Sequence, residues 1–248
     1  MEVHAHTHTA RKKWTHYFWE FLMLFLAVFC GFLAEYQLEH KIEKDREKVL
    51  AKAFYEDIKK DTAALINGIA FSKVKIKSAE SATSILRSDR SKWNDTLLYK
   101  DLTTLTTVYP FIATNGTYEQ MKASGSLRYF SQSLVNQMNA YYVQVSKTEH
   151  RDVLEDDHLR ERFIVLLIDI INIEVMSDIR LNQPITHGIY INQTGKADID
   201  KTVNLIAICK IVRTRSMMEY EAQLKIANSI LAALEKKYNL SERTPSEK

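Results

Sequence analysis

The chain has 248 residues, of which only 6 are Gly and 3 are Pro, well below the usual combined share of about 12%. Sandwiches, barrels and doubly wound α/β folds need frequent turn residues, so this composition excludes them and predicts an all-α fold. The 34 basic and 31 acidic residues leave a net charge of +3, which argues against nucleic acid as a partner. The 2 Cys are too few for a disulfide framework.

The first predicted element is an apolar helix over residues 17–34. Glu20 is the one charged residue in this stretch, whose helical length of roughly 27 Å is close to the hydrocarbon thickness of a bilayer. Aromatic residues flank it as in interfacial belts: Trp14, Tyr17, Phe18 and Trp19 on one side and Tyr36 on the other. The sequence therefore predicts a membrane-spanning helix within residues 14–36.

We expect this helix to be an uncleaved signal anchor. A cut after Ala34 would place Phe32 where signal peptidase needs a small side chain. Cys30 follows Phe29, whereas a lipoprotein signal needs a small residue before its cysteine. The later apolar runs, residues 163–173 and 203–212, are too short to cross a bilayer. The chain is therefore predicted to cross the membrane once.

Charges near the predicted span favour a cytoplasmic N-terminal tail, residues 1–13. Arg11, Lys12 and Lys13 directly precede the span, while Glu35 and Glu39 come first on the other side. Basic residues also follow within residues 35–49, which weakens the bias: Lys41, Lys44, Arg46 and Lys48. Because the N-terminal cluster is closer to the span, we expect an inner-membrane protein with a periplasmic body.

Apolar residues continue at helical spacing beyond the membrane exit, up to about residue 86. They predict a rod with coiled-coil character, a local break near Gly68 and an end at residues 88–91. Two short helices should follow, over residues 95–108 and 118–124, because Pro110 and Gly125 stop them.

A long helical pattern then covers residues 127–180. Its highly charged centre, residues 148–158, favours a solvated or bent stretch, and its segment 163–173 is apolar on almost every side. Such a segment is typical of a buried helix, with Asp169 as a buried charge that pairs with a cation. A loop follows, in which residues 189–191 resemble a short strand.

The last predicted helix, residues 199–238, begins after a possible cap at Asp198. Together the elements predict an elongated antiparallel helical bundle over residues 37–240. Residues 241–248 are predicted to be a disordered tail.

Few residues indicate chemistry. Glu155 and His158 have the Glu-x-x-His spacing of di-iron helices, but the chain lacks a second copy of the motif and the run around it is charged throughout. His4, His6 and His8, with His16, could bind a metal adventitiously. No nucleophile, phosphate-binding loop or catalytic cluster is recognisable. We therefore expect no cofactor, no metal site and no enzymatic activity.

One face of the predicted span is a candidate packing surface. It is formed by residues at alternating steps of four and three: Glu20, Leu24, Ala27, Gly31 and Ala34. The small pair Ala27 and Gly31 permits close approach of a second helix. If copies pack on this face, their Glu20 carboxylates converge, which would suit a proton or cation pathway. The alternative is that the Glu20 side chain extends to the membrane interface and has no role in transport.

Two segments also resemble a group of uncharacterised single-span envelope proteins of Bacteroidota. The matching residues are Glu20, Gly31-Phe32-Leu33-Ala34, and then Tyr118, Met121, Ser124, Gly125 and Leu127. The resemblance covers about the first half of the chain. It implies a bacterial envelope protein and transfers no activity, cofactor or catalytic residue.

The leading hypothesis is a membrane-tethered, non-enzymatic helical scaffold or interaction module. Its expected partners are the lipid bilayer, further copies of the chain and an envelope protein. The alternative is an oligomeric sensor or channel-like protein with Glu20 on the shared helix face.

Overall fold

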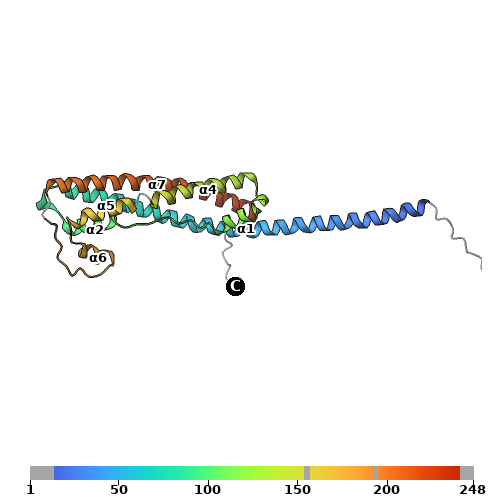
Figure 1. Ribbon diagram of the computed structural model, residues 1–248, viewed down its shortest axis with the longest axis horizontal. Coiled ribbons are helices and arrows are strands. Elements are labelled where there is room, and N and C mark those ends of the chain that lie inside the picture. The colour runs from blue at the N-terminus through green and yellow to red at the C-terminus, as the bar shows by residue number, and fades with distance from the viewer. Residues whose placement is uncertain (1–13, 154–156, 193–194, 241–248) are drawn as a thin grey trace, which may run out of the picture. The chain divides into compact units, whose positions relative to one another are not determined.

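The computed structural model describes residues 14–153, 157–192 and 195–240, and the chain divides into two units after Val49. Helices build the described part of both units (Figure 1), which confirms the predicted all-α fold. Within the described residues, extended pairing is limited to one isolated bridge between Ile171 and Ile191. The predicted tails, residues 1–13 and 241–248, lie outside the described residues.

Helix α1 (Trp14–Arg87) begins in the first unit and continues in the second. Residues 32–67 contain neither Gly nor Pro, so nothing in this stretch interrupts the backbone hydrogen bonds. The helix ends at Arg87, where the Ser88 hydroxyl donates a hydrogen bond to the Ile85 carbonyl. The predicted end at residues 88–91 is confirmed.

The predicted break near Gly68 is wrong, because α1 continues through this residue. Gly68 is instead a packing position. A Cβ atom on Gly68 would lie 2.8 Å from Cε2 of Tyr220, which is too close for a normal contact. The missing side chain therefore makes room for the Tyr220 ring.

The second unit is organised around α1 and α7 (Lys196–Tyr238). Buried residues of α1 recur at seven-residue spacing in two rows: Ala51, Ile58, Leu65, Ser72, Ala79 and Leu86, and Phe54, Asp61, Gly68, Lys75 and Ala82. One such row on α7 is Ile206, Arg213, Tyr220, Ala227 and Leu234. This spacing is typical of helices that pack side by side.

α7 runs antiparallel to α1 within this unit. The Tyr55 hydroxyl donates to Glu235 Oε1 at 2.7 Å, and Lys210 Nζ donates to Glu80 Oε1 at 2.6 Å. Tyr55 lies near the start of the part of α1 that belongs to this unit, and Glu235 lies near the end of α7. Glu80 lies near the end of α1, and Lys210 lies in the first half of α7. The predicted antiparallel packing is therefore present between these two helices.

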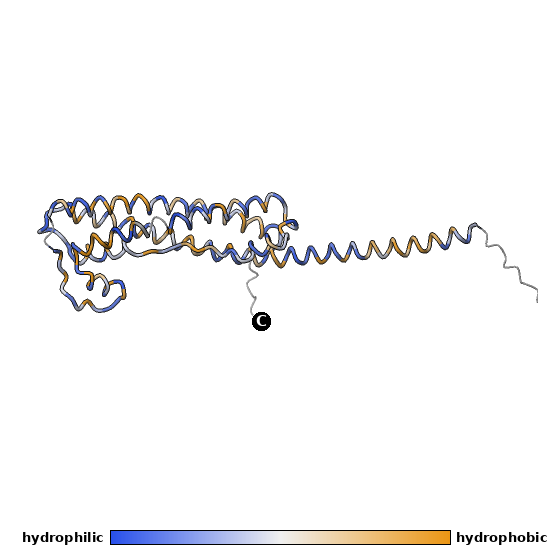
Figure 2. The backbone as a smooth tube through the Cα atoms, viewed as in Figure 1, coloured by the Kyte–Doolittle hydropathy of each residue, from blue (hydrophilic) through white to orange (hydrophobic). Residues whose placement is uncertain are grey.

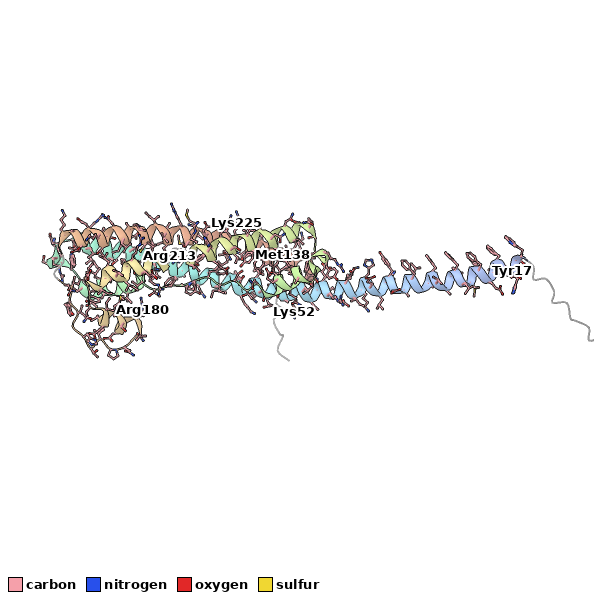
Figure 3. The ribbon with its side chains drawn as sticks, in the orientation of Figure 1. Tyr17, Lys52, Met138, Arg180, Arg213 and Lys225 are labelled. Atoms are coloured by element: carbon pink, nitrogen blue, oxygen red, sulfur yellow. The ribbon has the colours of Figure 1, made fainter. Side chains whose placement is uncertain are left out.

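Helix α4 (Gln132–Arg151) lies beside α7 (Figure 1). The hydroxyl of Ser131 caps α4 by accepting the Leu134 N–H, which satisfies one of the free donors at a helix start. Met138 points into the bundle (Figure 3) and is fully buried. Helix α5 (Asp157–Ile168) packs against α7 further along.

The two short helices are close to their predicted ranges. α2 (Asp95–Leu105) begins after Asn94, whose side chain accepts the Leu97 N–H. α3 (Gly116–Ala123) is followed by Gly125 at φ 68°, a left-handed conformation that glycine adopts at low cost. The 3₁₀ turns η1 (Arg90–Lys92) and η2 (Ser126–Tyr129) follow α1 and α3 respectively.

The long helical pattern predicted over residues 127–180 is not one continuous helix. The change from α4 to α5 falls within the charged centre, residues 148–158, where a bend was one of the two expectations, but the other interruptions were not predicted. The structure divides this range into η2, α4, α5 and α6 (Ile173–Arg180). Between α5 and α6 the chain leaves the helical conformation, because Ile171 pairs with Ile191 and Asn192 N–H donates to the Ile170 carbonyl. The Asn172 side chain then starts α6 by accepting the Glu174 N–H.

The predicted burial of residues 163–173 on all sides is also wrong. Phe163 and Leu167 are buried, but the side chains of Val165 and Ile168 are 67% and 56% exposed. Asp169 is exposed because α5 ends at Ile168, so it is not the buried charge that the sequence predicted.

The predicted helix cap at Asp198 is wrong as well. α7 begins at Lys196, directly after Gly195, and Asp198 lies in its first turn. The Asp198 carboxylate is 3.2 Å from Lys201 Nζ.

Two apolar clusters fill the second unit. One joins α3, α4 and the C-terminal half of α7 to the α1 residues from Ala51 to Ile69, and the other joins α2, α5, α6 and the start of α7 to the α1 residues from Ala79 to Leu86. Between these two clusters, the buried residues of α1 and α7 are polar: Ser72, Lys75, Ser78, Arg213 and Ser216. The second unit thus has a polar centre.

Candidate functional site

The predicted packing face lies on the N-terminal part of α1, which is apolar along its length (Figure 2). All five of its residues are exposed: Glu20, Leu24, Ala27, Gly31 and Ala34. At about 100° per residue they share one side of the helix. A Cβ atom on Gly31 would have no heavy atom within 4 Å. The face is therefore accessible to a partner.

Glu20 has a partner one turn earlier in α1. Its Oε1 atom lies 3.0 Å from Nε2 of His16, and both side chains are about half exposed, at 50% and 47%. When His16 is protonated, the contact is an ion pair at the beginning of the apolar stretch. This position fits a carboxylate held at the membrane boundary.

The opposite side of the same helix carries an aromatic ladder that the sequence reasoning did not recognise. Rings four residues apart stack, with centroids 6.3 Å apart for Phe21 and Phe25 and 5.9 Å apart for Phe25 and Phe29, and at the end of the ladder Tyr36 and His40 meet edge to face at 4.3 Å. The ladder comprises Trp14, Phe18, Phe21, Phe25, Phe29, Phe32, Tyr36 and His40. Steps of three and four between aromatic residues were the available signal. The helix therefore has one aromatic side and one side of small residues.

An 18-residue window of α1 has a mean hydropathy of 2.0, and none of it is buried within the chain. A core helix of a soluble protein would be mostly covered by its neighbours. One helix of the described residues is thus long and apolar enough to cross a membrane.

The second unit contains a buried carboxylate network. Asp61 is 1% exposed, and its two oxygens accept hydrogen bonds of 2.8 Å from the Thr114 N–H and the Tyr141 hydroxyl. Gln223 Nε2 donates to the same hydroxyl at 3.3 Å. Burial raises the pKa of Asp61, although the hydrogen bonds oppose this shift. The network joins α1, α4 and α7.

A second buried carboxylate, Asp152, lies beyond the end of α4. Its Oδ2 atom accepts hydrogen bonds from the Tyr220 hydroxyl at 2.5 Å and from the Phe111 N–H at 3.2 Å. Burial, and then the neighbouring Asp152 charge, raise the pKa of Tyr220. Tyr220 therefore remains a hydroxyl donor at neutral pH.

These carboxylates hold the non-helical segment of residues 106–115 that connects α2 to α3. Backbone N–H groups need a partner when they are buried outside a helix or sheet. Asp152, Glu149 and Asp61 accept those of Phe111, Ala113 and Thr114 in turn. Just after the segment, in the first turn of α3, the Thr117 hydroxyl donates a hydrogen bond of 2.5 Å to Asp57 Oδ2. The acidic side chains thus position the segment within the bundle.

A small pocket of about 20 Å³, room for about one water molecule, adjoins the polar centre, and its lining includes Lys75, Arg160 and Arg213. Arg213 is 2% exposed and lies inside the bundle (Figure 3). Lys75 Nζ donates to the Thr107 carbonyl at 2.8 Å. All three cations have interactions within the chain, so the pocket forms part of the buried polar network.

The described residues contain no group of three or more His, Cys, Asp and Glu that could hold a metal ion. Glu155 and the histidines at 4, 6 and 8 lie outside the described residues, and the side chain of His158 is not described. Neither Cys30 nor Cys209 forms a disulfide within the described residues.

Comparison with protein-family models, curated proteins and solved structures returns no match for this chain. Homology therefore assigns no family, and the resemblance to Bacteroidota envelope proteins remains a prediction.

Proposed function

We propose that the protein is a membrane-tethered, non-enzymatic helical scaffold of the bacterial envelope that associates with itself through α1. The observation that carries the proposal is the uncovered apolar window of α1, with a mean hydropathy of 2.0 and no residue buried within the chain. Such a surface is stable when lipid or another apolar helix covers it.

The proposed placement is a single pass through the inner membrane, with residues 1–13 in the cytoplasm and the bundle in the periplasm. The basic residues that directly precede the span support this orientation. A protease added to intact spheroplasts should digest a C-terminal tag, whereas an N-terminal tag should be digested only after lysis.

The two sides of α1 have different proposed roles. The aromatic ladder suits contact with lipid chains and their interfaces, since aromatic rings concentrate in interfacial belts. The opposite face suits a helix, because Ala27 and Gly31 let two backbones approach closely. The polar interior of the second unit stabilises the bundle, because its carboxylates are used by backbone and tyrosine donors.

Self-association is tested by measuring the oligomeric state of the purified full chain in mild detergent. We expect an oligomer, which Ala27→Leu and Gly31→Leu should weaken by about tenfold or more in dissociation constant, equivalent to about 1.4 kcal/mol. The matched control is Phe29→Leu on the aromatic side, which should not change the association. A strict monomer in detergent and in vesicles would contradict the proposal.

The channel-like alternative depends on Glu20 facing a shared axis. Glu20 Oε1 lies 3.0 Å from His16 Nε2, so a polar pair stands at the beginning of the apolar stretch. The scaffold proposal expects Glu20→Gln to leave proton and cation flux in liposomes unchanged. A flux that this variant abolishes would favour the channel.

A further inference from the structure

The packing face of α1 does not stop at the end of the apolar stretch. Three exposed aliphatic side chains, Leu38, Ile42 and Val49, continue it at 58%, 42% and 68% exposure. Leu38 and Val49 lie eleven and twenty-two residues after Ala27, and Ile42 lies eleven after Gly31. At about 100° per residue, eleven residues complete slightly more than three full turns. The stripe from Leu24 to Val49 therefore keeps to one side of the helix, which it shares with one acidic residue, Asp45, eleven residues after Ala34.

Lipid cannot cover the far part of this stripe when residues 17–34 fill the bilayer. At about 1.5 Å per residue, Ile42 lies about 12 Å and Val49 about 22 Å beyond Ala34. The headgroup region extends only about 5–7 Å past the hydrocarbon core. Both side chains then face water unless a protein partner covers them.

We propose that this stripe pairs with the same stripe of a second copy, in a parallel helix dimer that continues from the membrane to Val49. The inference rests on the proposed function, because it needs residues 17–34 in the bilayer. A second copy is the matching occupant: it inserts in the same direction, so its stripe lies at the same depth and has the same length. In the membrane the copies meet at Ala27 and Gly31, and in water they meet at Ile42 and Val49.

The spacing of the stripe also sets the geometry of the pair. A seven-residue repeat would continue from Ala34 to Lys41 and Lys48 and would produce a left-handed supercoil. The apolar residues are instead Ile42, eleven residues after Gly31, and Val49, eleven residues after Leu38. An eleven-residue repeat favours a right-handed crossing. A right-handed crossing is also common for small-x-x-x-small pairs in membranes.

The test is disulfide cross-linking of single-cysteine variants of the full chain in vesicles. The background replaces the two natural thiols by Cys30→Ser and Cys209→Ala. Cysteine is then placed at Leu38, Ile42 or Val49 on the stripe, at Lys41 or Lys48 on the seven-residue alternative, and at His40 or Glu47 on the opposite side. Copper phenanthroline is the oxidant, and each variant is also tested by carbonate extraction and by size in detergent.

The proposal expects strong dimer formation for Leu38→Cys, Ile42→Cys and Val49→Cys, with at least fivefold lower yields at the other four positions. Dominant linking through Lys41→Cys and Lys48→Cys would overturn the right-handed geometry, and equal yields at all positions would overturn the stripe. If the variants are oligomeric in detergent and remain in membranes but none cross-links, the stripe proposal fails and the proposed function stands. If they are monomeric or extractable, the proposed function fails.

Discussion

Asp61 shows how one residue can connect burial to pH dependence. Its side chain is 1% exposed and accepts the Thr114 N–H and the Tyr141 hydroxyl. Burial raises its pKa above the ordinary value of 3.8. The native state therefore binds this proton more tightly than the unfolded state, and the contribution of Asp61 to stability falls as pH rises through its native pKa.

Asp61→Asn should remove this dependence, because an asparagine amide can still accept from Thr114 and contact Tyr141. In urea unfolding, the stability of the variant relative to the natural chain should increase with pH from about 4 upward and then level off. The exposed Asp200→Asn is the matched control and should show no such trend. A difference that decreases with pH would contradict the direction of the pKa shift.

Gly68 provides a second prediction at the scale of one residue. Gly68→Ala should improve helix propensity by up to about 1 kcal/mol, but its Cβ would approach Tyr220 Cε2 to 2.8 Å. The Tyr220 ring cannot move freely because its hydroxyl is bonded to Asp152. We expect a net loss of about 1–2 kcal/mol in thermal or urea unfolding. Gly116→Ala, which meets no atom within 4 Å, should be nearly neutral, and an equal effect in both variants would contradict this role of Gly68.

At the scale of elements, local signals located several boundaries correctly. The end of α1, the start of α2 at Asp95 and the stop at Gly125 depend on neighbouring residues, so the sequence alone could predict them. The division of residues 127–180 depends instead on contacts far along the chain. The Tyr99 hydroxyl accepts the Asn172 N–H at 2.7 Å and donates to the Tyr190 carbonyl. The spacing of apolar residues in the sequence does not indicate a hydrogen bond between residues this far apart.

The buried carboxylates were missed for a related reason. Asp61 follows Phe54 at a seven-residue step, yet in the charged stretch around it the residue is indistinguishable from a solvated acid. Its burial depends on Thr114 and Tyr141, which come from a connecting segment and from α4. The packing face of α1 could be proposed from the sequence alone, since all of its residues lie on one helix, and it stays a prediction.

Tyr99→Phe tests the long-range bond that holds the α5–α6 connection. The variant keeps the buried ring but leaves the Asn172 N–H without its acceptor, so we expect a loss of about 1–3 kcal/mol. Hydrogen exchange at the amides of Asn172 and Asn192 should accelerate more than exchange in α4. Tyr129→Phe is the matched control, because its hydroxyl interacts with the neighbouring Arg128. Unchanged exchange at Asn172 would show that the Tyr99 hydroxyl does not hold this connection.

At the scale of the whole molecule, the surfaces of the two units suit different surroundings. The first unit exposes large apolar side chains along α1, while the second buries its apolar side chains in two clusters on either side of a polar centre. A bilayer around residues 17–34 of the first unit and water around the second unit reconcile these surfaces. The proposed function and the geometry of the proposed dimer both depend on this assignment of the apolar part of α1 to the bilayer.

Alkaline carbonate extraction of membranes that contain the full chain tests the assignment most directly. The natural chain and the apolar control Leu26→Ile/Phe29→Leu should both remain in the membrane pellet. Leu26→Arg/Phe29→Arg places two charges in the apolar window, at about 2.5–3.5 kcal/mol each, and should shift the protein to the soluble fraction with its helical circular dichroism retained. Recovery of the natural chain in the carbonate supernatant would contradict a membrane-embedded α1.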